Sequence, residues 1–272
     1  MYSGTTIHTK SGRIMGVHQK VDRIARRHLA RRGMLPSNFP NIREILHFEG
    51  ANGPDGLKRK RPGIDEPWHF IEPNQSITGS ELGAMIHDHI SNLAVALGSS
   101  DQERAAFEAA WLAHAITDGL TPAHHYPLQD KLSQLHGASG RVERNTTRKK
   151  LIIPGKTRRQ AVRNNWEYWG AKGVMTTHLH FEWGVAAAIA TMRFDTFSFF
   201  PNLTKVTSRK SFDDQFDKSL REISSMEMYE EFATKGWTRH LASETKNILV
   251  PEIVRIVMLG WLVAINESDT AI

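Results

Sequence analysis

Apolar residues recur at helical spacing along nearly the whole chain, whereas runs that alternate with a period of two are scarce. Val17, Val21 and Ile24, for example, line one face of a helix that Gly33 can end. Side chains repeated every three or four residues reach a common core only when the backbone is helical. The sequence therefore predicts an all-α fold.

Residues able to cap helices mark the starts of most of the expected helices. We expect a short helix that begins at Asn38 or Asn41 and ends near Gly50, and we expect Pro251 in the first turn of a late helix. Longer helices are expected over 80–97, 101–118, 157–171 and 174–192, with two or three more within 212–265. The segment 51–75 is rich in Gly, Pro and charge and is predicted to be a long loop, where functional residues often lie.

The 272 residues, 40% of them hydrophobic, suffice for one large core, so 1–272 is interpreted as a single domain with a basic insertion at about 137–172. The longest apolar stretch, 256–265, is about half of what a helix needs to cross a bilayer, which predicts a buried terminal helix and no transmembrane segment. Because residues 1–16 lack the apolar run of a signal peptide, a cytoplasmic location is expected.

The net charge of +6 is unevenly distributed, since segment 141–172 holds ten Lys or Arg against two acids. Such a patch suits a polyanion, either nucleic acid or an anionic membrane surface; the alternative is a solvated insertion without a partner. Trp166, Tyr168 and Trp169 lie within it and would stack on bases, sit at a lipid interface or pack their own helix.

The chain has no cysteine but fourteen histidines, so a transition metal would have to be held by His, Asp and Glu. His114 and Asp118 lie four residues apart in a strong helical pattern, and His124 follows a turn marked by Gly and Pro. A later helix carries His178 and Glu182, also four apart. Two helices that each offer a His/carboxylate pair are typical of metal sites in helical bundles, with Zn²⁺ the first candidate and Mn²⁺ or Fe²⁺ as alternatives.

These motifs resemble those of the zinc-dependent phospholipases C and, more distantly, the S1/P1-type nucleases that share their fold. The pattern H-x3-D-x5-H is matched by His114, Asp118 and His124, and the later H-x2-F-E pattern by His178, Phe181 and Glu182. The family also has an upstream Asp, followed by a His that begins an HF-x-D/E-P segment, and Asp55 and His69 match these two positions. A family histidine on the N-terminal helix corresponds to His18. The likeness spans roughly residues 15–190.

The resemblance implies one multi-helix domain with metal ligands on facing helices and two or three zinc ions. One ion would take Asp55, His69, His114 and Asp118; a second, His124, His178 and Glu182; a third would share Asp118 with His18. In the family, an N-terminal Trp exposed by signal-peptide cleavage supplies its amine and carbonyl to the third ion. This chain has no such Trp, and His8 is the candidate substitute. It also departs in the long separation of His124 from His178, which are 54 positions apart in the sequence.

The resulting hypothesis is a phosphodiester hydrolase, with phospholipid head groups the first substrate class and single-stranded nucleic acid the second. Paired divalent ions lower the pKa of water and neutralise phosphate oxygens, and Asp55 is the candidate general base. A non-catalytic, zinc-stabilised protein that binds polyanions is the rival from another class. His87 and Asp88 match the adjacent His-Asp pair of the HD-domain phosphohydrolases, which are a weaker alternative. His125 and His180 are interpreted as neighbours of the proposed metal site.

Overall fold

The computed structural model describes residues 1–3, 16–56, 69–125, 134–135, 152–192, 203 and 208–270. Within these residues the chain forms helices and connecting segments and no strand, which confirms the all-α prediction. His8, Trp68 and residues 137–151 of the basic insertion lie outside the described residues. The helices are α1 (Val17–Arg31), α2 (Ile42–His47), α4 (Glu81–Gly98), α5 (Gln102–Gly119), α8 (Arg158–Trp169), α9 (Val174–Ile189), α10 (Arg209–Ser224), α11 (Met228–Lys235), α12 (Arg239–Glu244) and α13 (Val250–Thr270).

The helices begin where capping residues occur in the sequence. The side chains of Ser80, Asp101 and Thr157 accept hydrogen bonds from backbone N–H groups in the first turns of α4, α5 and α8. Asn41 forms a reciprocal capping box with Glu44 at the start of α2. Because these side chains satisfy backbone donors that have no partner within the helix, they fix where each helix starts.

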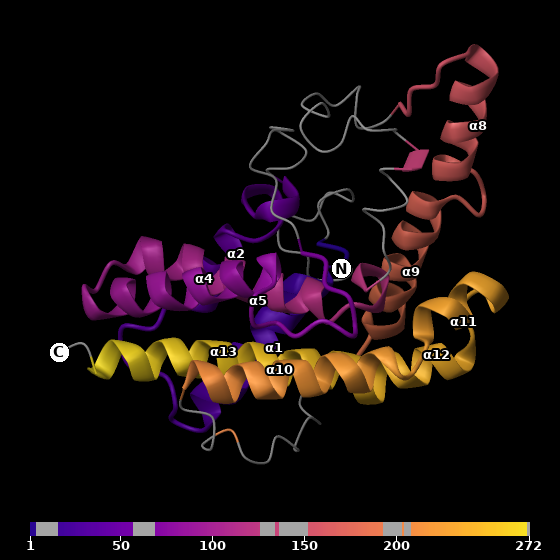
Figure 1. Ribbon diagram of the computed structural model, residues 1–272. Helices are drawn as coiled ribbons and strands as arrows, with labels where there is room; N and C mark the ends of the chain where they lie inside the picture. Colours follow the sequence, from indigo (N-terminus) through magenta and orange to yellow (C-terminus); the bar gives the residue numbers. More distant parts are fainter. Residues whose placement is uncertain are drawn as a thin grey trace.

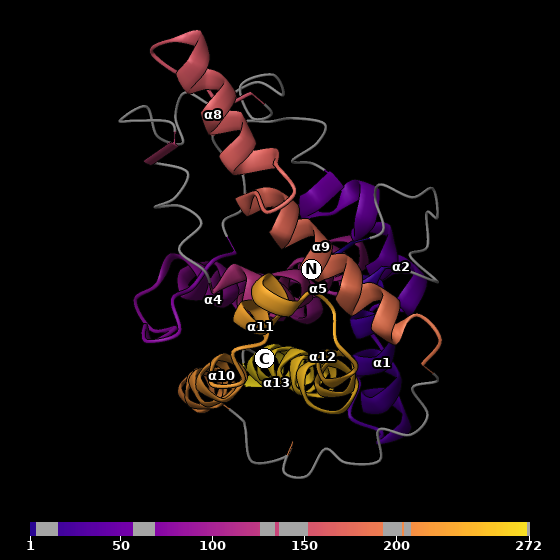
Figure 2. The same cartoon turned by 90° about the vertical axis from the view of Figure 1, so that its right-hand side faces the viewer.

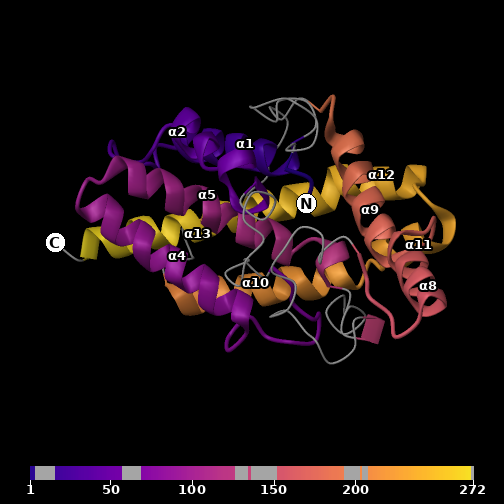
Figure 3. The same ribbon diagram turned by 90° about the horizontal axis from the view of Figure 1, so that it is seen from above.

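The core is organised around α13, whose residues 256–265 are all buried, as the sequence predicted. In Figures 1 and 3, α13 lies between α1 on one side and α4 and α10 on the other, with α5 packed along it. The indole nitrogen of Trp261 donates to the carbonyl of Ala109 in α5 at 3.0 Å. The helix that carries His114 and Asp118 is therefore fixed against the apolar, largely buried helix α13.

One helical run, Arg239–Asp269, is long and apolar enough to cross a membrane, and 78% of its most apolar window is buried inside the protein. The core helix of a soluble protein meets the same criteria, so the run is weak evidence for a membrane span. Thr245–Leu249 within it forms a π-helical turn, followed by Pro251. Pro251 has no N–H for the fourth carbonyl before it, which favours a wider turn at that point.

Lys20 joins α1 to the end of α9. Its ammonium group is buried and donates to the carbonyls of Ile189 and Ala190, at 2.7 and 2.8 Å. These carbonyls belong to the last turn of α9, where the helix supplies no N–H partner. Lys20 therefore fixes α9, with the two candidate ligands it carries, against α1.

We expect Lys20→Met to lower the free energy of unfolding by about 1–3 kcal/mol, because the apolar stem is kept while two buried carbonyls lose a charged donor. Urea denaturation followed by circular dichroism measures the change. Lys218→Met is the matched control, because the Lys218 side chain is 59% exposed and its replacement should change stability by less than about 0.5 kcal/mol. Equal effects of the two substitutions would contradict the assigned role of Lys20.

Candidate metal centre

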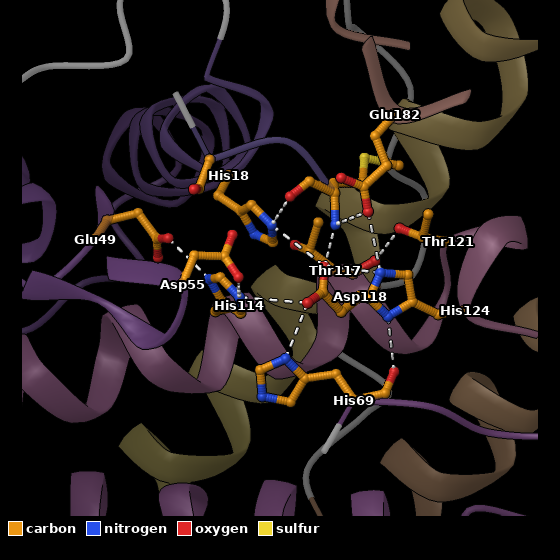
Figure 4. A network of polar contacts seen from close by, with 12 residues as sticks. His18, Glu49, Asp55, His69, His114, Thr117, Asp118, Thr121, His124 and Glu182 are labelled. Carbon is orange, nitrogen blue, oxygen red and sulfur yellow. Dashed lines mark hydrogen bonds and ion pairs between the residues drawn. The ribbon is translucent and has the colours of Figure 1, made fainter. Parts of the chain in front are cut away.

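The structure brings together all eight of the predicted ligands, from segments far apart in the sequence. Figure 4 labels these ligands with the exception of His178. α5 and α9 contribute a pair each. The others come from α1, from the short turn around residue 55, from the loop after residue 68 and from the 3-10 turn Pro122–His124. The eight are His18, Asp55, His69, His114, Asp118, His124, His178 and Glu182.

Local structure explains how α5 and the turn after it present three of these side chains. His114 and Asp118 are one helical turn apart, and their side-chain atoms Nε2 and Oδ2 are 3.3 Å apart. After the helix ends, the N–H of His124 donates to the carbonyl of Thr121 in a 3-10 turn that begins with Pro122. The turn reverses the chain and returns His124 to the side on which Asp118 points (Figure 4).

Two groups of three side chains have the compactness that a single ion requires. His69, His114 and Asp118 form one, in which His69 Nδ1 is 2.9 Å from Asp118 Oδ2. His124, His178 and Glu182 form the other, in which both histidine Nε2 atoms lie 3.0–3.2 Å from Glu182 Oε1. All six side chains are buried.

Asp55 and His18 form a third group with His114. His114 Nε2 is 3.9 Å from Asp55 Oδ1, and the rings of His18 and His114 are stacked with centroids 3.8 Å apart. This grouping joins Asp55 to His18, whereas the family resemblance implies Asp55 with His69 and Asp118. Asp55 thus lies between two of the sets implied by the sequence.

The two oxygens of Asp118 face different partners. Oδ2 faces His69 and His114, whereas Oδ1 is 3.2 Å from His18 Nε2 and 3.9 Å from His124 Nε2. A carboxylate arranged in this way can coordinate one ion through each oxygen. The sequence-based assignment of Asp118 as a bridge therefore matches the geometry.

The N-terminal residue lies inside the cluster, which sequence reasoning did not foresee. The Met1 amine donates to Asp118 Oδ1 and lies 3.4 Å from Glu182 Oε1, and the Met1 carbonyl oxygen is 2.7 Å from His18 Nε2. The backbone of Met1 thus supplies an amine and a carbonyl beside His18. This is the position where the family resemblance called for a terminal Trp, and where His8 was the candidate substitute.

A carboxylate behind His114 was also missed. Glu49 Oε1 lies 2.8 Å from His114 Nδ1, which leaves His114 Nε2 directed toward Asp55 and Asp118. A carboxylate that binds the far nitrogen of a histidine fixes its tautomer and makes the near nitrogen a better ligand. No motif spacing marks Glu49, because the contact joins residues 65 apart in the sequence.

The pKa shifts show a site arranged to hold positive charge. Burial acts to raise the pKa of Asp118, but the Met1 amine and nearby histidines hold it well below its usual value. Burial likewise opposes protonation of His114, yet Glu49 and Asp118 raise its pKa to about 10. The Met1 amine follows the same pattern, since carboxylates led by Asp118 outweigh burial and raise its pKa to about 10. The buried carboxylates therefore carry negative charge that divalent cations would balance.

A buried nitrogen atom of His114 fits this interpretation. His114 Nε2 lies 3.3 Å from Asp118 Oδ2 but makes no hydrogen bond of regular geometry. Leaving such a group unpaired costs about 1–3 kcal/mol unless something else binds it. His114 Nε2 faces two carboxylates, so a cation there would complete its coordination. With no thiolate in the chain, the donor set suits Zn²⁺, Mn²⁺ or Fe²⁺.

The other candidate histidines lie outside the cluster. His125 is buried with Nε2 donating to the carbonyl of Gly119 at 3.0 Å, and burial lowers its pKa to about 4, so it braces the turn after α5 as a neutral side chain. His180 is exposed on α9. His87 lies 2.7 Å from Asp213 on α10, an isolated pair rather than the start of a second metal site.

Together, the fold and the cluster define a helical protein with a buried histidine and carboxylate centre of metal-site geometry. Comparison of the chain with known protein families, curated proteins and solved structures finds no match. The family likeness therefore rests on the motifs and on where the structure places their residues.

Proposed function

We propose that the chain is a zinc-dependent phosphodiester hydrolase of the phospholipase C kind. The observation that carries the proposal is the convergence of eight motif residues in one buried cluster, where Asp118 faces both halves. The two compact groups would each hold one ion, and His18, Asp118 and the Met1 backbone would hold a third. When bound, such ions supply hydroxide at neutral pH and neutralise the phosphate oxygens.

Asp55 differs from the other candidate ligands in its access to solvent. Its side chain is 29% exposed, compared with 9% or less for every other member of the cluster. An exposed carboxylate beside the centre can accept a proton from water and pass it to bulk solvent. This supports the role of general base in addition to that of ligand.

Apolar side chains beside the centre favour a lipid substrate. Leu179 and Trp183 lie four residues apart on one side of α9, next to the side that carries Glu182, and are 40% and 44% exposed. The ring of Tyr2, next to Met1, makes an edge contact with Trp183 at 5.8 Å. Exposed aromatic and aliphatic groups near a phosphate-cleaving centre suit the acyl and glycerol part of a phospholipid better than a nucleotide backbone.

A nuclease is the second candidate function, favoured by one observation. Segment 141–172 carries ten basic residues against two acids, a charge balance that suits a nucleic-acid backbone. We place this activity after phospholipid cleavage, in line with the order in which the sequence motifs resemble the two families.

Metal analysis followed by a substrate panel tests the proposal. We expect at least two zinc ions per chain after purification without chelators, and hydrolysis of phosphatidylcholine that a chelator abolishes and zinc restores. Single-stranded DNA is assayed beside it, and cleavage of DNA alone would replace the phospholipase by the nuclease. A chain that holds less than one zinc ion, or that holds zinc and cleaves neither substrate, would refute the enzyme proposal.

Asp55→Asn separates the catalytic role from metal binding. We expect a fall in kcat of about 10²–10⁴-fold with most of the zinc retained, because the amide keeps one ligand oxygen but cannot accept the proton. Asp217→Asn is the matched control, a partly buried acid on α10 that binds Ser76 and the backbone of residue 77. Unchanged kcat in Asp55→Asn would remove the general-base role.

A further inference from the structure

The helix α8 has an exposed face that is both apolar and basic. Val162 and Trp166 are each 71% exposed and lie four residues apart, so they form one ridge. Trp169, 38% exposed, extends it by a further turn. Figures 1 and 2 show α8 at the end of α9, projecting from the helix bundle.

The opposite face of α8 is held in place, so the exposed ridge belongs to a fixed helix. Asn164 is buried and donates to the carbonyls of Leu135 and Pro154, at 3.0 and 2.8 Å. Tyr168 is 2% exposed and belongs to a small core with Leu135 and Ile153. The sequence left open whether the aromatic residues here pack their helix; Tyr168 does so, whereas Trp166 faces solvent.

A second segment of the chain, residues 152–153, lies beside α8. The backbone N–H and carbonyl of Ile153 bind the side chain of Asn165, at 3.0 and 2.7 Å, and the neighbouring Ile152 is 51% exposed. α8 and this segment together therefore expose two aliphatic side chains, Ile152 and Val162, and two tryptophans. Exposed apolar groups gathered in this way mark an interaction site more often than scattered ones do.

Positive charge surrounds this apolar surface. Between residues 152 and 172 there are five Lys or Arg and a single acid, Glu167, which is 3.5 Å from Arg163. Arg158 and Arg159 are exposed, one turn before Val162 on the same side of the helix. We call the set Ile152, Arg158, Arg159, Val162, Trp166 and Trp169 the α8 surface.

We propose that the α8 surface docks the protein on an anionic lipid bilayer. Tryptophan is favoured at the head-group level, aliphatic side chains gain from reaching the acyl boundary, and arginines attract anionic head groups. Nucleic acid would use the arginines and stack on the tryptophans, but it offers nothing to Ile152 and Val162. The mixed aliphatic and aromatic content therefore selects the membrane over a nucleic-acid partner.

The proposal deepens the proposed function, because docking would bring a phospholipid-cleaving centre to its substrate, but its test does not require hydrolysis. Co-sedimentation of the full chain with vesicles of phosphatidylcholine, with and without 30% phosphatidylserine, measures binding directly. We expect binding that needs the anionic lipid and weakens as salt is raised. A chain that binds vesicles but cleaves no lipid would refute the phospholipase activity and keep the docking surface.

Two sets of variants probe the two halves of the surface. Replacing Arg158 and Arg159 together by Gln should weaken vesicle binding about 30-fold, because each charge near the bilayer contributes about 1 kcal/mol to binding. Val162→Ala with Trp166→Ala should weaken it at least about tenfold through lost apolar contact. Circular dichroism verifies that each variant keeps its fold.

Matched controls lie on other helices. Val95 on α4 is 70% exposed, so Val95→Ala removes an equally exposed side chain elsewhere. Lys210 and Arg221 are exposed on α10, so replacing both by Gln removes the same charge from another surface. Equal loss in variants and controls, or equal binding to neutral vesicles, would overturn the proposal. So would binding of single-stranded DNA that depends on Trp166 without any binding to vesicles.

Discussion

Asp118→Asn is expected to abolish hydrolysis, lowering kcat/KM by about 10³-fold or more, and to reduce the zinc content of the purified chain. The two oxygens of this carboxylate face different partner sets, His69 and His114 on one side and His18 on the other. An asparagine keeps the shape but has a single acceptor oxygen and no charge. Whichever way the amide turns, its NH2 group faces histidine nitrogens or the Met1 amine.

Zinc analysis and hydrolysis of phosphatidylcholine measure the effect, and Glu108→Gln supplies the matched control. Glu108 is a fully buried carboxylate on the same helix, bound by His89 and Arg104, and ten residues before Asp118, or about 15 Å along the axis. It should cost stability without changing zinc content. If Asp118→Asn retained both its zinc and its activity, Asp118 would not be a bridging ligand.

The helices could be predicted from the sequence because their signals are local. Ser80, Asp101 and Thr157 cap the helices whose starts they were expected to mark, and Gly33, at a φ of 66°, follows the end of α1. The ligand pairs on α5 and α9 were predictable for the same reason, since four residues make about one helical turn. Local spacing was therefore sufficient to predict the two ligand pairs that these helices direct toward the centre.

Contacts between distant backbone groups were beyond this reasoning. The Met1 amine and carbonyl carry no side-chain signature, and only the packing of α1 against α5 brings them to Asp118. Glu49 reaches His114 from a loop, and no spacing relates the two. The same limit applied to Trp166 and Tyr168, because helical periodicity gives the faces of α8 but not which face packs.

The position of Met1 leads to the second large effect. A Gly-Ser extension ahead of Met1 turns its amine into an amide, which is a much poorer ligand and cannot carry the charge that faces Asp118 and Glu182. Met1 is also 2% exposed, so the buried surroundings leave little room for added residues. We expect the extended chain to lose about one zinc ion and about 10²-fold in activity.

The matched control is the same extension at the C-terminus, since the last turn of α13 lies at one end of the bundle, away from Met1 (Figure 1). His18→Gln gives an independent check, because His18 lies 2.7 Å from the Met1 carbonyl and belongs to the same proposed ion. If both changes remove that ion, each alone should lower activity to a similar level and the combination should lower it little further, since residues that serve one ion are not additive. Additive losses would assign Met1 and His18 to different roles, and full activity of the N-terminally extended chain would exclude the amine from the centre.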